Sequence, residues 1–89
     1  MTERTATIAS RVGLHARPAS LFIEAVKKQP MRVTISKAGS APLDAASILS
    51  IMSLGAANGD VVTLAAEGEG ADAALAELVA LLETDLDAE

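Results

Sequence analysis

The sequence predicts an α+β fold in which a single β-sheet carries its helices on one face, in the order β-α-β-β-α-β-α. Three observations support this fold class. Strand-like and helix-like segments alternate along the chain, the connections between them are short, and every segment is amphipathic, so one sheet covered on one side is the economical solution. The 89 residues are enough for one hydrophobic core, and we expect residues 1–89 to form a single domain.

Four segments have the composition of β-strands. Residues 6–9 are expected to be extended, and residues 31–37 alternate apolar and polar side chains, which is the period of a half-buried strand. Residues 43–45 follow a turn and form a short return strand. Residues 61–65 are β-branched and follow a predicted turn at residues 58–60, so they are expected to form the fourth strand.

The first predicted helix covers residues 16–28. Phe22, Ala25 and Val26 lie at the spacing of a core-facing stripe, and Lys27 and Lys28 suit the negative end of the helix dipole.

Two further helices are predicted. The second is short, at residues 47–54, with Ser47 as its N-cap and Gly55 as its end. The third covers residues 71–82, and its apolar stripe is interpreted as core. The stripe consists of Leu75, Leu78, Val79 and Leu82.

Composition excludes several classes of protein. With one Phe, no Trp and no Tyr, the core must be aliphatic, and an acidic chain of net charge −5 without aromatic surface is unsuited to nucleic acid. No cysteine is present and only one histidine, so neither a disulfide framework nor a protein-only metal site is expected. No segment has the length of a membrane span and the first residues lack a signal-peptide core, so we expect a cytoplasmic protein with no membrane insertion.

The basic residues are confined to the first part of the chain. Residues 1–40 hold all seven Lys and Arg with two acidic residues, a net charge of +5, whereas residues 41–89 hold ten acidic residues and no base. Distant acids are screened beyond about 8–10 Å, so nearby bases set the field in the first part. Such a cluster is large enough to hold a phosphoryl group and to meet an acidic partner protein.

The only histidine lies in the run GLHARPA, residues 13–19, where a strand gives way to a helix. Pro18 fits the first turn of that helix, because a missing N–H costs little there. His15 would then face the unpaired backbone N–H groups of Ala16 and Arg17 and the positive end of the helix dipole, a place that suits an anionic oxygen group. A nucleophile active near neutral pH beside the Arg17 guanidinium predicts transient phosphoryl transfer through His15.

This run, together with SIL at residues 47–49 and MSLG at residues 52–55, resembles the histidine-containing phosphocarrier (HPr) family of the bacterial phosphoenolpyruvate-dependent sugar phosphotransferase system. The resemblance covers nearly the whole chain and implies an open-faced β-sandwich, with a four-stranded antiparallel sheet and three helices on one side. It implies that Nδ1 of His15 accepts a phosphoryl group from enzyme I and passes it to the A domain of a sugar-specific enzyme II, and that Arg17 assists. Such a protein is a cofactor-free carrier rather than a turnover enzyme, and we expect a monomer.

The resemblance also implies a docking surface around the histidine. Its apolar residues would be Ala19, Phe22, Ile48, Leu49 and Met52. In the family, phosphorylation at the serine matching Ser47 lowers acceptance at the histidine and recruits a regulator, so a regulatory kinase or a transcriptional regulator could be a further partner.

Three departures from the family pattern stand out. Val12 replaces a residue that is polar in many relatives, the turn at residues 38–42 has one extra residue, and Leu49 and Ser50 replace the Met-Gly that usually follows Ser-Ile in the regulated form. Two alternatives therefore stay open beside the general sugar carrier. One is a carrier dedicated to dihydroxyacetone phosphorylation or nitrogen-linked regulation, and the other is mainly a regulatory binding module controlled at Ser47.

Overall fold

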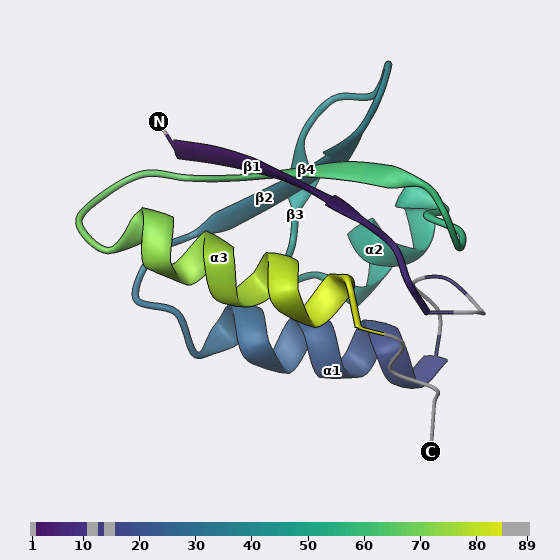
Figure 1. Ribbon diagram of the computed structural model, residues 1–89, viewed down its shortest axis with the longest axis horizontal. Coiled ribbons are helices and arrows are strands. Elements are labelled where there is room, and N and C mark those ends of the chain that lie inside the picture. The colour runs from purple at the N-terminus through teal and green to yellow at the C-terminus, as the bar shows by residue number, and fades with distance from the viewer. Residues whose placement is uncertain (1, 11–12, 14–15, 85–89) are drawn as a thin grey trace.

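The computed structural model describes residues 2–10, 13 and 16–84 of the chain. In this part of the chain the element order is β-α-β-β-α-β-α, and one four-stranded sheet carries the three helices on the same face (Figure 1). The α+β class, the strand order along the chain and the open-faced sandwich are therefore confirmed.

The sheet is antiparallel throughout. Its strands are β1 (Thr2–Thr7), β2 (Val33–Lys37), β3 (Leu43–Asp44) and β4 (Val61–Ala66), arranged in the order β1-β4-β2-β3. β4 pairs with β1 along one edge and with β2 along the other, so its backbone is hydrogen-bonded on both sides. In register, β1 runs from the pair Thr2–Ala66 to the pair Thr7–Val61, and β2 runs from the pair Val33–Ala66 to the pair Lys37–Val62.

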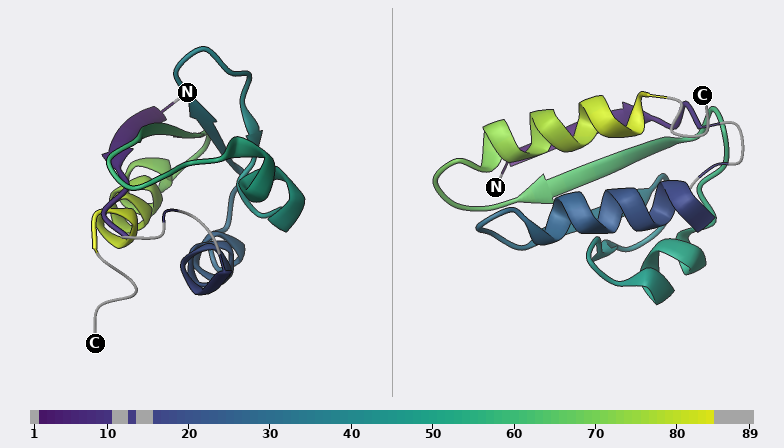
Figure 2. Two further views of the ribbon diagram at one scale, coloured as in Figure 1. Left: turned by 90° about the vertical axis from the view of Figure 1, so that its right-hand side faces the viewer. Right: turned by 90° about the horizontal axis from the view of Figure 1, so that it is seen from below.

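The helices lie in one layer beneath the sheet. α1 (Ala16–Lys27) and α3 (Ala71–Leu82) lie side by side and run in opposite directions, and the shorter α2 (Ile48–Leu54) packs beside α1 (Figure 2). The bounds of α3 are those that its apolar stripe predicts. α2 begins one residue after its predicted cap, because Ser47 is the N-cap itself, and it ends where Gly55 adopts a left-handed conformation with φ of 64°.

The core between sheet and helices is aliphatic, as the composition predicts, apart from the fully buried Phe22. β2 and β4 contribute most of the strand residues in this core, β1 contributes Ala6, and each helix contributes one stripe. The largest fully buried side chains are Phe22, Ile8, Ile35, Ile51, Leu64, Leu75, Leu78, Leu82, Val33, Val62 and Pro18.

The first strand differs most from its prediction. The sequence pattern indicates residues 6–9, whereas β1 covers Thr2–Thr7. Apolar alternation is absent because Arg4, which shares a face of the strand with Ala6, is polar and forms an ion pair with Asp72 of α3 at 2.8 Å. Ile8 still pairs with the chain before β4, but the Ala9 N–H turns away and donates to the Leu82 carbonyl of α3 at 3.0 Å.

The other boundaries shift by one or two residues. β2 begins at Val33 rather than at residue 31, β3 ends at Asp44, and β4 continues to Ala66. α1 ends at Lys27, where the next two backbone N–H groups tighten the last turn by bonding to carbonyls three residues back.

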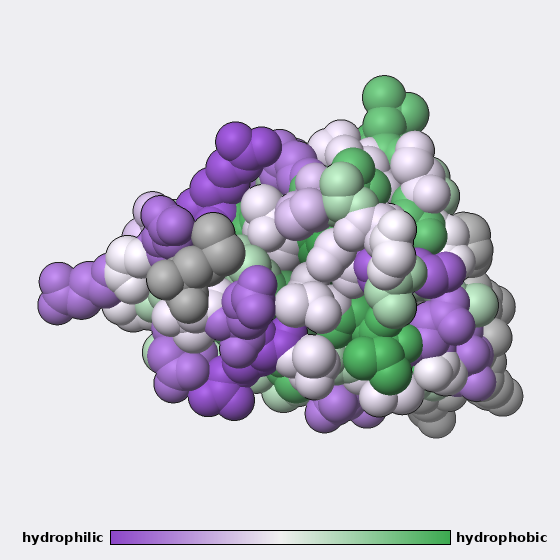
Figure 3. All heavy atoms as spheres, turned by 90° about the horizontal axis from the view of Figure 1, so that it is seen from above, coloured by the Kyte–Doolittle hydropathy of each residue, from purple (hydrophilic) through white to green (hydrophobic). Residues whose placement is uncertain are grey.

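The sheet face away from the helices is mixed in polarity. Figure 3 looks onto this face, where hydrophobic side chains form their larger clusters in the right half of the view. Val61 of β4 is the exposed large apolar residue of the sheet, with 53% of its surface accessible. Within the described residues, the helices are all too short or too polar to cross a bilayer.

Candidate functional site

The amino end of α1 is the centre of the predicted site. His15 lies outside the described residues, and α1 begins at the next residue, Ala16. Pro18 is fully buried in the first turn, where its missing N–H leaves no intrahelical bond unmade. Arg17 is an exposed basic residue in the first turn of the same helix. The first backbone N–H groups of any helix lack intrahelical acceptors, which makes this end suited to phosphoryl oxygens.

A tight turn precedes the predicted histidine. The Gly13 N–H donates to the Ser10 carbonyl at 3.0 Å, and Gly13 has φ of 73°, a conformation that side-chain-bearing residues rarely adopt. A Cβ at position 13 would lie 2.5 Å from the Ala56 carbonyl oxygen and 2.8 Å from Ala57 Cα. Glycine is therefore required both by its positive φ and by the close approach of the backbone at Ala56 and Ala57, the segment that follows α2.

The loop between α2 and β4 holds this turn from the other side. The Asn58 side-chain amide donates to the carbonyls of Ala9 and Ser10, at 3.1 and 3.2 Å. The Gly59 N–H donates to the Ile8 carbonyl at 2.9 Å, so backbone pairing continues past the end of β1. In Figure 1 this loop lies beside the end of β1.

Asp60 fixes the shape of the same loop. Its carboxylate accepts the Ala57 N–H at 2.9 Å and forms an ion pair with Lys37 of β2 at 3.2 Å. Lys37 also donates to the Gly55 carbonyl at 3.3 Å. The hydrogen bond from Ala57, followed by that from Lys37, lowers the pKa of Asp60 below its ordinary value of 3.8, so this carboxylate keeps its charge across the neutral pH range.

α2 presents apolar side chains to solvent. Ile48, Leu49 and Met52 expose 46%, 77% and 37% of their surfaces, and we call these three residues the α2 patch. Ser47 caps the helix by accepting the Ser50 N–H on its hydroxyl at 3.3 Å, as the sequence predicts. Exposed large apolar residues on a short helix are typical of a protein-binding surface.

Known proteins share both the sequence and this geometry. A family model described as the PTS HPr component phosphorylation site matches residues 2–84. The chain belongs to the HPr family. It is 44% identical to the phosphocarrier protein HPr of Streptomyces coelicolor, over 98% of this chain and 94% of that protein. It is also 33% identical to the HPr-like protein Crh of Halalkalibacterium halodurans, over 96% of this chain and all of that protein.

Solved structures agree with this family assignment. The crystal structure of HPr-C-His from Thermoanaerobacter tengcongensis aligns with a TM-score of 0.90 and 40% identity, over all of this chain and 99% of that one. The Bacillus anthracis phosphocarrier protein HPr aligns with a TM-score of 0.85 and 33% identity, covering 91% of this chain and 95% of that one. Membership of the HPr family gives this chain a phosphocarrier role in the phosphotransferase system.

Two residues of the expected docking surface lie elsewhere. Ala19 and Phe22 are both 0% exposed and belong to the core, so the expectation that they offer apolar surface to a partner is wrong. They share the stripe of α1 that faces the sheet, because positions three residues apart lie on the same side of a helix. Of the expected surface, the residues with exposed side chains are those of the α2 patch.

The sequence does not single out the loop at residues 55–60 as part of an HPr site. Asn58, Gly59 and Asp60 indicate only a turn before a strand. Their contacts with residues 8–10 and with Lys37 join segments far apart in the chain, so no local pattern reports them.

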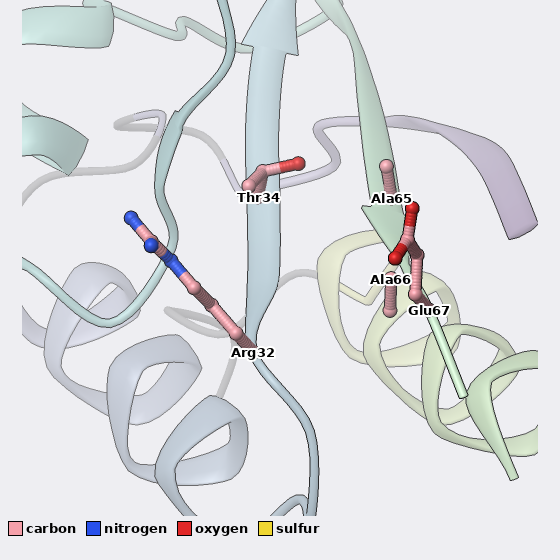
Figure 4. Close-up of a pocket in the computed structure, with 5 residues that line it drawn as sticks. All are labelled: Arg32, Thr34, Ala65, Ala66 and Glu67. Carbon is pink, nitrogen blue, oxygen red and sulfur yellow. The ribbon is translucent and has the colours of Figure 1, made fainter. Parts of the chain in front are cut away.

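A hollow beside the sheet lies away from these residues. It has a volume of about 310 Å³ and is found between β2 and the end of β4 (Figure 4). The Arg32 side chain extends away from Glu67, which leaves the hollow open. Its lining contains none of the predicted site residues and consists of Arg32, Thr34, Ala65, Ala66 and Glu67.

Proposed function

We propose that this HPr-family chain carries phosphoryl groups through His15, which accepts one from phospho-enzyme I and passes it to the A domain of a sugar-specific enzyme II. One observation carries the proposal: the chain's single histidine directly precedes α1 and lies inside the region that the family's phosphorylation-site model matches. An exposed Arg17 two residues further on adds a cation at the place where phosphoryl oxygens would lie.

The proposed chemistry is a balanced transfer. In the first transfer, a P–N bond forms at Nδ1 of His15 as the bond between phosphorus and enzyme I breaks. In the second transfer, a bond forms between phosphorus and the A domain of enzyme II as the P–N bond to His15 breaks. The Ala16 and Arg17 backbone N–H groups and the Arg17 guanidinium stabilise the negative charge on the transferred oxygens. Positioning and such electrostatic stabilisation account for most of the catalysis of phosphoryl transfer by proteins. No substrate is converted on this chain, so it acts as a carrier and not as a turnover enzyme.

The α2 patch is the proposed docking surface for enzyme I and for the A domains. It adjoins α1, and its apolar residues are already exposed, so binding removes them from water without unfolding anything. Met52 is flexible and polarizable, which suits repeated binding to several different partners.

Leu49→Asp is expected to weaken binding to enzyme I by at least about tenfold, because a charge replaces an exposed apolar contact residue. Its stability should stay within about 0.5 kcal/mol of wild type, since Leu49 is mostly exposed and an acid in a first helical turn is tolerated. Titration calorimetry and urea unfolding measure the two quantities. Val61→Asp, which adds the same charge on the sheet, is the matched control and should bind normally. Wild-type affinity in Leu49→Asp would remove the α2 patch from the interface.

A relay experiment tests the proposed function. The chain is charged by enzyme I and phosphoenolpyruvate, separated from them, and mixed with purified A domains of sugar-specific enzymes II. Rapid discharge to these domains is expected. Discharge only to dihydroxyacetone or nitrogen-branch acceptors would instead assign the chain to a dedicated branch.

A regulatory role at Ser47 is a second candidate. Its support is that Ser47 caps α2 directly beside the α2 patch, and that a 33% identical relative is named HPr-like protein Crh. A phosphate at this position would be tolerated by the helix dipole, but it would add about two negative charges next to the surface that meets enzyme I.

Ser47→Asp is therefore expected to slow phosphorylation of His15 several-fold while the fold survives. Quench-flow measurement of phosphoryl transfer from enzyme I gives the rate, and Ser40→Asp, at an exposed serine in the turn after β2, is the control. A wild-type rate in Ser47→Asp would leave Ser47 as a helix cap only.

A further inference from the structure

The side chain of Asn58 makes contacts that a simple turn residue does not need. Its amide nitrogen donates to two consecutive carbonyls, those of Ala9 and Ser10, across 49 and 48 residues of sequence. Both acceptors are carbonyl oxygens, so the partners fix which end of the amide faces them. Asn58 thereby connects the chain that follows α2 to the chain that precedes α1.

These two carbonyls lie where the sheet can no longer hold the chain. β1 ends at Thr7, and the last backbone pairs before the turn are those of Ile8 with the chain at residues 59 and 60. Beyond them the Ala9 and Ser10 carbonyls have left the strand ladder, and the Asn58 amide takes the place of a strand partner.

The Ser10 carbonyl is shared between two donors. It accepts the Asn58 amide at 3.2 Å and the Gly13 N–H at 3.0 Å, so both of its lone pairs are used. The bond from Gly13 closes the turn. The bond from Asn58 therefore anchors the same carbonyl oxygen on which the turn closes. On its other side, Gly13 presses directly against the backbone at Ala56 and Ala57.

The loop that carries Asn58 is itself fixed to the sheet. Asp60 accepts the Ala57 N–H, and Lys37 of β2 contacts both the Asp60 carboxylate and the Gly55 carbonyl. A continuous series of contacts thus runs from the middle of the sheet through this loop to the turn at residues 10–13. Ser10 and Gly13 are therefore fixed relative to the sheet, and a fixed support is the condition for orienting a reacting group.

We propose that Asn58 is a positioning residue for phosphoryl transfer, acting through the turn at residues 10–13 on the histidine two residues beyond Gly13. The inference rests on the proposed role of His15. The Asn58 amide bonds to the Ala9 and Ser10 carbonyls, and its proposed effect is to hold the chain before α1 in the orientation that transfer requires.

The test compares Asn58 with a matched amide elsewhere. Gln29 also donates from its side-chain amide to a backbone carbonyl, that of Ala25, and to Glu77, but it lies after the other end of α1. Asn58→Ala, Asn58→Asp and Gln29→Ala are measured for phosphorylation by enzyme I over a range of carrier concentrations. Amide hydrogen exchange of Gly13 reports the turn in the same samples.

Asn58→Ala and the isosteric Asn58→Asp are expected to lower kcat about tenfold with KM unchanged, because a misplaced nucleophile slows transfer without weakening docking. Exchange at Gly13 should become faster in both. Gln29→Ala should keep wild-type kcat and Gly13 exchange. A wild-type kcat in both Asn58 variants would overturn the proposal. So would a fall in kcat that is no larger in the Asn58 variants than in Gln29→Ala.

His15→Ala separates this inference from the one on which it rests. If His15→Ala still accepts the phosphoryl group, the proposed function is wrong and the role of Asn58 falls with it. If His15→Ala is inert while the Asn58 variants transfer normally, only the positioning role is wrong.

Discussion

Replacing Phe22 with alanine is expected to lower the free energy of unfolding by about 3–5 kcal/mol. Phe22 is 0% exposed and is the only Phe, Tyr or Trp of the chain, so its removal leaves a cavity that aliphatic neighbours fill poorly. A domain of this length has a total stability of roughly 4–13 kcal/mol, so the loss is a large fraction of it. Urea unfolding followed by circular dichroism measures the change.

Phe22→Leu is the matched control for this prediction. It keeps an apolar side chain and most of the volume, and it should lose less than half as much stability as Phe22→Ala. A loss below about 1 kcal/mol for Phe22→Ala, combined with weaker binding to enzyme I, would return Phe22 to the docking surface.

Arg17→Ala is expected to slow phosphoryl transfer to the chain by about a hundredfold with its stability unchanged. A guanidinium can neutralise oxygens as they are transferred, and removing one preorganised donor from such a site typically costs about two to three orders of magnitude in rate. Arg17 is exposed at the start of α1, and interactions of exposed charged side chains typically contribute less than about 1 kcal/mol to stability. Quench-flow kinetics with phospho-enzyme I give the rate.

Two substitutions control this experiment. Arg17→Lys keeps the charge but loses the planar fork, so it should recover part of the rate. Arg32→Ala removes an exposed arginine in the connection that follows the other end of α1, and should transfer normally. A rate in Arg17→Ala equal to that of Arg32→Ala would mean that Arg17 is a solvated side chain without a role in transfer.

The parts of the fold that local patterns determine are predicted well. α3 has the predicted bounds, and α2 lies between its predicted caps, Ser47 and Gly55, because capping residues and left-handed glycines act within one turn. The prediction places β1 too late because the helix-side position before Ala6 holds Arg4, whose partner is the distant Asp72 of α3, so no apolar alternation marks the start of the strand.

Of the residues expected on the docking surface, three are exposed and two are buried. Periodicity identifies the buried face of a helix, but it does not identify which exposed residues meet a partner. The spacing already puts Phe22 on the core stripe of α1, and the resemblance puts it on the surface as well; the structure places it and Ala19 in the core. Leu49 is mostly exposed, as a docking residue must be.

The support around the turn could not be predicted because it is tertiary. The bond from Asn58 to Ser10 spans 48 residues, and the contact that requires glycine at position 13 is made by backbone atoms at residues 56 and 57. A sequence pattern can indicate that Asn58 lies in a turn, but it cannot report which distant carbonyl the side chain reaches.

Intact mass spectrometry after incubation with phosphoenolpyruvate and enzyme I tests the role of His15 most directly. We expect one added phosphoryl group on the wild-type chain, lost on brief acid treatment as a phosphoramidate is, retained in Ser47→Ala and absent from His15→Ala. A phosphoryl group that survives acid, or one that His15→Ala still acquires, would contradict transfer through this histidine.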